Sequence, residues 1–240
     1  MGHKVSPTCL RLSLNKRWAS RWFTDNKRTF VSYVKEDLTI REFLKKELAA
    51  AAVARIDIER SPDRLHIKIH TARPGVLIGR RGENIQRLEE AVRRIVGPQK
   101  QLKMDPVEVS NPYIEAQLIA ESIAFQLVKR IAYRRAMKRA IQQAMESGAK
   151  GIRIICAGRL GGAEMKRRES YRQGKVPLGT LRSEIDFGQS TAHTTAGCIG
   201  TKVWIYKGDL VPLKVAAEKD ASASSMTPPA AARAADEAKR

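Results

Sequence analysis

Two glycines enclose two arginines in the segment Gly79-Arg80-Arg81-Gly82, and these residue types suit contact with phosphate groups. Glycine lacks a Cβ, so another backbone can approach it closely, and it adopts turn conformations that are closed to other residues. The helix predicted to follow directly presents free N–H groups and the positive end of its dipole to an anion. Arg80 and Arg81 add positive charge. The segment therefore predicts a loop that holds a sugar–phosphate backbone by shape and charge.

Other phosphate-binding loops do not fit this segment. A P-loop requires Gly-Lys-Ser/Thr after its glycines, and a dinucleotide-binding turn requires G-x-G spacing; both are missing here. A bare G-x-x-G also occurs in ordinary loops that precede helices. The elements around the loop must therefore decide its function.

The elements around the loop follow a specific order. The patterns predict a helix at Thr39–Val53 with Thr39 as its N-cap, strands at Ala54–Glu59 and Arg64–Thr71, a short turn at Gly75–Ile78, an amphipathic helix that ends at Val96, and a strand at Gln101–Ser110. The order helix, strand, strand, short helix, G-x-x-G, helix, strand matches the type II KH domain, an RNA-binding fold. We place this domain at residues 39–110.

A second basic segment lies in the helical region predicted for residues 113–148. No acidic residue occurs from Ser122 to Met145. Like charges four residues apart oppose a helix by about 0.2–0.5 kcal/mol per pair. An external polyanion would remove this cost, whereas a solvated helix face would retain it. The predicted contact residues lie in two rows along this helix: Arg130, Arg134 and Lys138 in one, Arg135 and Arg139 in the other.

The remaining segments complete the predicted domains. Strands are expected at Lys150–Ala157, Leu181–Phe187 and Cys198–Tyr206, with a glycine-rich turn at residues 158–164 and a connection at residues 189–197. Together with the helices they predict a C-terminal α/β domain at residues 111–215. Residues 1–38 are predicted to be a basic arm and residues 216–240 a disordered tail without net charge. The fold class is therefore α+β.

Charge and composition narrow the possible partners. Lys and Arg number 45 against 25 Asp and Glu, so the net charge is +20 and the partner is expected to be a polyanion. No apolar run approaches the roughly 20 residues of a membrane span, and no secretory signal is evident, so an intracellular protein without membrane contact is predicted.

The candidate catalytic and metal-binding residues are few. The three cysteines lie far apart, which argues against a zinc site or a disulfide framework. His66 and His70 are about 13 Å apart along a strand, too far to share a metal. His193 lies among hydroxyl residues without a cysteine or carboxylate at a telling spacing. We therefore predict no catalytic residue, no metal and no cofactor.

Several segments of residues 2–212 resemble the bacterial small-subunit ribosomal protein S-three family. The chain departs from that family at Thr8–Ser13, where the family usually carries glycines. The shared motifs, in register, are Gly2-His3-Lys4-Val5-Ser6-Pro7, His70-Thr71-Ala72-Arg73-Pro74-Gly75, Arg134-Arg135-Ala136-Met137-Lys138-Arg139-Ala140, Gly158-Arg159-Leu160-Gly161-Gly162-Ala163-Glu164 and Ala192-His193-Thr194-Thr195.

The resemblance implies a structural component of the small ribosomal subunit head in the cytoplasm, bound to small-subunit ribosomal RNA. It also implies contacts with proteins of the S-ten and S-fourteen families, chiefly through the C-terminal domain. Members of the family line the tunnel where mRNA enters, and the positions implicated there are Arg134, Arg135 and Lys138. They are thought to grip mRNA through its phosphates and to assist its unwinding during translation.

Two other functions fit the sequence less well. A free-standing KH regulator would need base-stacking side chains near Gly79–Gly82, where Val76, Leu77 and Ile78 offer only an apolar platform. An enzyme such as a nuclease or DNA-damage lyase would need a metal–carboxylate cluster or an activated lysine, and no residue spacing indicates either. The expected protein is not an enzyme.

Overall fold

The computed structural model describes residues 5–61, 63–97 and 101–210. Along this part of the chain, no helix is both long and apolar enough to cross a membrane. The helices and strands are α1 (Pro7–Leu10), β1 (Ser20–Arg21), α2 (Lys27–Glu47), β2 (Val53–Arg60), β3 (Arg64–Thr71), α3 (Pro74–Ile78), α4 (Glu83–Val96), β4 (Gln101–Glu108), α5 (Ala116–Val128), α6 (Tyr133–Glu146), β5 (Gly151–Gly158), β6 (Arg167–Gly174), β7 (Ser183–Thr194) and β8 (Gly197–Asp209).

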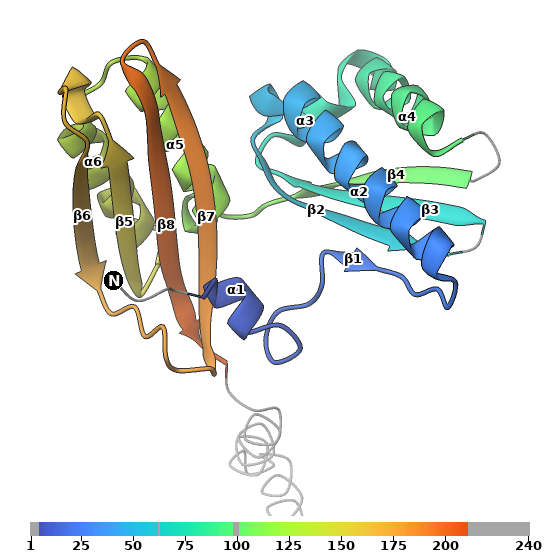
Figure 1. Ribbon diagram of the computed structural model, residues 1–240, viewed down its shortest axis with the longest axis horizontal. Helices are drawn as coiled ribbons and strands as arrows, with labels where there is room; N and C mark the ends of the chain where they lie inside the picture. Colours follow the sequence, from blue (N-terminus) through green and yellow to red (C-terminus); the bar gives the residue numbers. More distant parts are fainter. Residues whose placement is uncertain (1–4, 62, 98–100, 211–240) are drawn as a thin grey trace, which may run out of the picture. The chain divides into compact units, whose positions relative to one another are not determined.

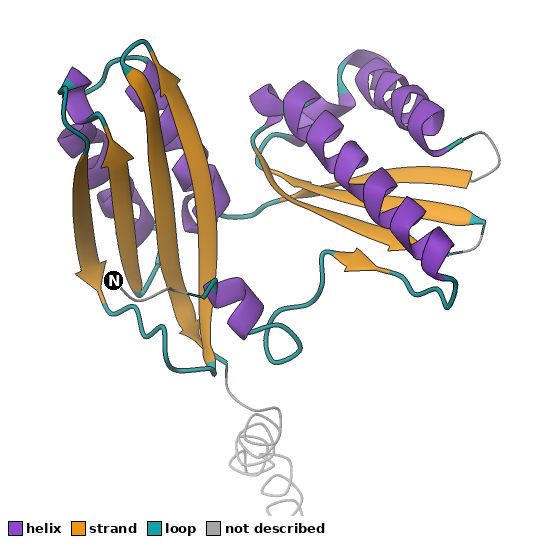
Figure 2. Ribbon diagram, in the orientation of Figure 1, coloured by secondary structure: helices purple, strands orange, loops and turns teal. Residues whose placement is uncertain are grey.

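The first sheet has the order β1-β2-β3-β4, and α2, α3 and α4 lie over one of its faces (Figures 1 and 2). β2 and β3 are antiparallel, whereas β3 and β4 are parallel. Leu65, Ile67 and Ile69 alternate along β3 and are buried, because successive strand residues point to opposite faces. This arrangement confirms the predicted order of KH elements.

The first helix of this domain was predicted with the wrong limits. α2 begins at Lys27, and its N-cap is Asn26, whose side chain accepts a hydrogen bond from the Arg28 N–H. Thr39, predicted as the N-cap, lies inside the helix and donates its hydroxyl hydrogen to the Lys35 carbonyl. The predicted arm at residues 1–38 therefore contains the first half of α2.

A polar network holds the first half of α2, whose apolar residues Phe30, Val31, Val34 and Leu38 are exposed. Arg60 of β2 forms ion pairs with Glu36 and Asp37, both at 2.6 Å, and its guanidinium lies 4.7 Å from the centre of the Tyr33 ring. The Trp22 indole donates a hydrogen bond of 2.9 Å to Asp37. Charged groups, and not a buried apolar face, therefore attach this part of α2 to β2.

The second sheet has the order β6-β5-β8-β7, with α5 and α6 on one face (Figures 1 and 2). β5 pairs antiparallel with both β6 and β8. Ile123 of α5, Met137 of α6, Ile152 and Ile154 of β5, and Val203 of β8 are buried in the core between helices and sheet. The predicted α/β architecture of the C-terminal domain is confirmed.

Two features of this domain differ from expectation. The helical region predicted at residues 113–148 is two helices, because residues 129–132 interrupt it and Arg130 adopts a left-handed φ of 60°. The connection predicted at residues 189–197 is mostly strand, since β7 continues to Thr194 and β8 begins at Gly197. A two-residue turn joins them.

The N-terminal segment is fixed by one buried arginine. Arg11 is fully buried, and its guanidinium donates hydrogen bonds to five backbone carbonyls, those of Pro7, Pro177, Leu178, Thr180 and Ser183. Its burial lowers the pKa of the guanidinium. Further along, β1 pairs in parallel with β2. The described part of the basic arm predicted at residues 1–38 therefore contacts both domains.

Close backbone approach ties α5 to the second sheet at Gly188 of β7. A Cβ on Gly188 would lie 2.4 Å from the backbone of Ala116, the first residue of α5. The Asp186 carboxylate accepts a hydrogen bond of 2.9 Å from the Ala116 N–H, and Lys207 of β8 pairs with Glu115 at 2.5 Å. Glycine at position 188 lets the helix start directly on the strand.

We expect Gly188→Ala to destabilise the protein, because the methyl group must push α5 away from β7. Overpacking of this kind costs about 1–3 kcal/mol. Gly179→Ala is the matched control, since nothing lies within 4 Å of its added Cβ. Urea unfolding of both variants measures the difference. Equal midpoints for the two variants would show that α5 does not depend on this close approach.

Candidate nucleic-acid interface

The Gly79–Gly82 loop has the backbone that its glycines predict. Gly79 and Gly82 have positive φ angles of 72° and 81°, and Arg81 between them has φ 53°. The loop forms a short 3-10 turn, η2 (Arg80–Gly82), between α3 and α4. Both arginine side chains are exposed. The loop can therefore present two guanidinium groups to a phosphate backbone without any rearrangement of the core.

Asn84, in the first turn of α4, supports the loop through a contact with α3. The Asn84 amide donates a hydrogen bond of 3.1 Å to the Val76 carbonyl in α3. A Cβ on Gly79 would lie 2.7 Å from the Asn84 side chain. No side chain caps the N-terminus of α4, which begins at Glu83 directly after the loop. The loop and the helix start thus form one electropositive, rigid edge.

Of the five basic residues predicted to contact RNA in this region, four lie together on α6. Ala136, Met137, Ala140, Ile141 and Ala144 face the sheet and are buried. Arg134, Arg135, Lys138 and Arg139 are exposed on the opposite side. Across the described residues, none of these four forms an ion pair within 4 Å. The phenol of Tyr133 raises the pKa of Arg134 chiefly through a hydrogen bond.

The fifth position, Arg130, was predicted in the wrong structural context. It lies in the turn before α6 and not on a helical row with Arg134 and Lys138. The prediction treated residues 113–148 as continuous helix, and a break at residues 129–132 removes that register. Arg130 remains exposed, close in sequence to the N-terminus of α6, so it adds charge there without belonging to the row.

The open face of the first sheet carries charge pairs, not a metal site. His66 lies 2.6 Å from Asp105, and His70 lies 3.3 Å from Asp57. The hydrogen bond from His66 is the main reason that the pKa of Asp105 is lowered, with Lys103 adding to the effect. Within the described ranges no group of three or more His, Cys, Asp or Glu side chains could hold a metal ion.

The structure shows one contact that the sequence did not predict. His193 was judged to lack a cysteine at a telling spacing, but its Nδ1 lies 3.2 Å from the Cys198 Sγ. The two residues flank the turn between β7 and β8 and face each other across the hairpin. A two-residue turn at Thr195–Ala196 sets this register, and neither residue is typical of such a turn.

Comparison with known proteins agrees with the two halves of the fold. Residues 39–113 match the family described as KH domain, and residues 123–205 match Ribosomal protein S3, C-terminal domain. The protein "Small ribosomal subunit protein uS3" of Magnetococcus marinus is 51% identical over 214 residues, which are 89% of this chain and 100% of that relative. The protein of the same name from Methylacidiphilum infernorum is 52% identical over 205 residues, 85% of this chain and 95% of the relative.

The fold and the braced loop define a two-domain protein of the RNA-binding KH class, with an α/β domain after the KH domain. The identity with full-length relatives is more specific. The chain belongs to the small ribosomal subunit protein uS3 family. This confirms the resemblance that the sequence motifs predicted, and the family is one of ribosomal proteins and not of enzymes.

We expect the double substitution Arg80→Asp, Arg81→Asp to weaken binding to single-stranded RNA while the fold stays intact, because both side chains are exposed and aspartate tolerates a left-handed φ at position 81. Each lost phosphate contact should reduce the slope of log K against log salt by about 0.7. Fluorescence anisotropy across a salt series measures both changes.

The control is Lys27→Asp, Arg28→Asp in the first turn of α2, which makes the same change of charge at the opposite end of the helix from Glu47, the end that lies beside Asn84. An equal loss of affinity in both double variants would mean that net charge, not the loop, determines binding.

Proposed function

We propose that the chain is a structural constituent of the small ribosomal subunit head, where it binds ribosomal RNA and lines the mRNA entry tunnel. The KH loop at Gly79–Gly82 contacts ribosomal RNA, and α6 contacts the phosphates of the incoming mRNA. The name of the relatives, "Small ribosomal subunit protein uS3", supports the first part. The geometry of α6 supports the second.

The observation that carries the mRNA role is the charge of α6, whose four exposed cations form no ion pair with the described residues. Arg134 and Arg135 lie in its first turn, where the helix dipole disfavours cations, and no acidic residue lies there. Arg134 with Lys138 and Arg135 with Arg139 are like-charge pairs four residues apart, each unfavourable by about 0.2–0.5 kcal/mol. An anionic strand along this face would attract these cations and offset the repulsion between them.

Contacts of this kind suit a site that every message must pass. Guanidinium and ammonium groups on phosphates position a strand without reading its sequence. Aromatic side chains that stack on bases would favour some sequences over others, and the exposed face of α6 carries cations instead. A strand gripped by its phosphates as it is pulled forward is withdrawn from any duplex ahead of it, which assists unwinding.

We expect Arg134→Ala, Arg135→Ala, Lys138→Ala to slow translation through messages with a stable hairpin more than through unstructured messages. The three side chains point away from the buried face of α6, so folding should not suffer. Ribosomes reconstituted with the variant and followed codon by codon on paired messages, with and without a hairpin, measure the ratio of the two rates.

The matched control is Lys35→Ala, Lys45→Ala, Lys46→Ala on exposed positions of α2, which removes the same charge from the other domain. It should slow neither message selectively. Equal slowing of both messages by the α6 variant would contradict the entry-tunnel role and leave only a general contribution to RNA binding.

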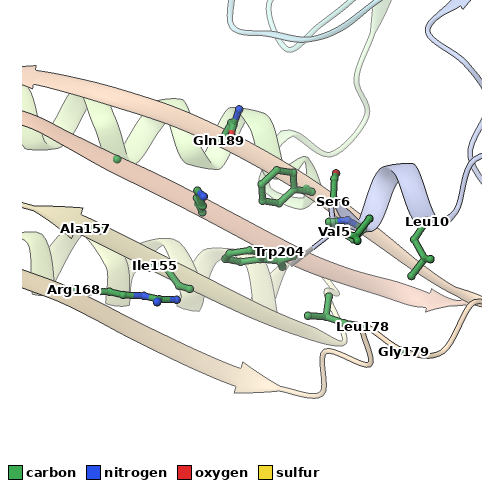
Figure 3. A pocket seen from close by; sticks show the side chains of 14 residues that line it. Val5, Ser6, Leu10, Ile155, Ala157, Arg168, Leu178, Gly179, Gln189 and Trp204 are labelled. Carbon is green, nitrogen blue, oxygen red and sulfur yellow. The ribbon is translucent and has the colours of Figure 1, made fainter. Parts of the chain in front are cut away.

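The face of the second sheet opposite α5 and α6 is the surface that we propose for protein neighbours of the S-ten and S-fourteen families. Ile155, Ile185 and Trp204 form a small buried apolar cluster there, and Phe187 packs against the Trp204 ring at 5.2 Å. A hollow of about 790 Å³ lies between this cluster and Val5 and Leu10 of the N-terminal segment, with Arg168 and Lys202 in its lining (Figure 3). An apolar centre with basic groups beside it fits an apolar segment that carries acidic residues.

We expect the chain to travel with the small ribosomal subunit when a cell lysate is separated on a density gradient, and to remain there at high salt. A component held by many RNA and protein contacts resists salt, whereas a protein held only by phosphate contacts loses affinity steeply. Immunodetection across the fractions measures its distribution. Recovery mainly in light fractions would contradict the assignment as a subunit constituent.

A further inference from the structure

Cys198 faces an imidazole across the β7–β8 hairpin. His193 of β7 lies with its Nδ1 3.2 Å from the Cys198 Sγ. Gly158 at the end of β5 pairs with Ile199, the residue after Cys198. The Arg159 guanidinium donates a 2.8 Å hydrogen bond to the Ala196 carbonyl in the hairpin turn.

The arrangement is one in which a cysteine can react. A nucleophile and a base within hydrogen-bond reach of each other are the usual signature of an activated side chain. His193 can accept the thiol proton at Nδ1, and Arg159 holds the hairpin turn through its bond to Ala196. Both Cys198 and His193 are exposed.

The other two cysteines have different surroundings. Cys156 is fully buried in the core of the C-terminal domain, and desolvation raises the pKa of its thiol. Cys9 in α1 is exposed. In the described structure Cys9 has no hydrogen bond to an imidazole, which makes it a reference for an unassisted exposed thiol within the same molecule.

We propose that Cys198, with His193 and Arg159, is a redox-modification site that reacts with hydroperoxides and then with a low-molecular-weight thiol. His193 takes the thiol proton, the Cys198 sulfur attacks one peroxide oxygen and the O–O bond breaks. His193 then gives the proton to the departing hydroxide or alkoxide, which leaves as water or as an alcohol. The sulfur is oxidised to the sulfenic acid. A thiol such as glutathione then displaces water and forms a mixed disulfide.

The first test measures alkylation of each cysteine in the purified full-length protein at pH 7.4 by iodoacetamide, followed by peptide mass spectrometry. A base that takes the thiol proton speeds the attack of the sulfur on the reagent. We expect Cys198 to react several-fold faster than Cys9, and Cys156 to be unreactive in the folded protein. Equal rates for Cys198 and Cys9 would overturn the proposal.

The second test separates activation from mere exposure. His193→Gln keeps a polar side chain on the hairpin but cannot take the thiol proton, so the rate at Cys198 should fall to that of Cys9, which serves as the internal control. After treatment with hydrogen peroxide and glutathione, the mass of the glutathione adduct should appear on Cys198 in the parent protein and be strongly reduced in the variant. An unchanged rate and an unchanged adduct in the variant would overturn the assigned role of His193.

This proposal rests on the hairpin geometry and not on the ribosomal assignment. The alkylation and adduct measurements use the free chain, so their failure would leave the sedimentation of the protein unaffected. Conversely, the reactivity of Cys198 can be measured whether or not the chain sediments with the small subunit.

Discussion

The long helices cover one face of each sheet, and this constraint shapes the rest of the molecule. In the KH domain α2, α3 and α4 bury the alternating Leu65, Ile67 and Ile69. The opposite face carries ion pairs such as His66 with Asp105 and Lys68 with Glu59, which need no cover. In the C-terminal domain the face opposite α5 and α6 holds Phe187 and Trp204 instead, beside the N-terminal segment with α1. A sheet face with an apolar cluster and a basic rim suits a partner better than it suits water.

The two domains present positive charge in different ways. In the KH loop the backbone does the positioning: two glycines and Arg81 have positive φ, and Asn84 locks the loop to α3. On α6 a regular helix positions the charges at intervals of three and four residues. Since neither set is paired with acids in the described structure, both tolerate self-repulsion that an anionic strand would relieve. Charge placement, more than net charge, distinguishes these surfaces.

Sequence patterns predicted the elements that are built on hydrophobic periodicity. β3 is found at Arg64–Thr71 as expected, and α4 ends at Val96 as expected. The start of α2 was missed because Arg60 holds it through ion pairs with Glu36 and Asp37, contacts with another strand that hydrophobic periodicity does not report. The break before α6 was missed because Arg130 adopts a left-handed conformation, and the sequence has no glycine there to indicate it.

Contacts between distant segments were also beyond the reach of sequence patterns. The five carbonyls bound by Arg11 come mostly from residues 177–183, and nothing in a basic N-terminal segment predicts a buried arginine without a carboxylate. Ser13 has a left-handed φ of 65°, a conformation that glycine adopts more readily than serine. The sequence of this segment therefore gives no sign of the turn at Ser13.

The buried and exposed faces of α6 show how a binding surface can coexist with a stable fold. Ala136, Ala140 and Ala144 recur every four residues on its buried face, and these small side chains let the helix lie close to the sheet. Met137 and Ile141 supply the apolar area, about 1.5–3 kcal/mol for each side chain buried fully. That gain exceeds the cost of the like-charge pairs on the outer face, about 0.2–0.5 kcal/mol each. The cations are therefore free to serve a ligand, because the helix does not need them to fold.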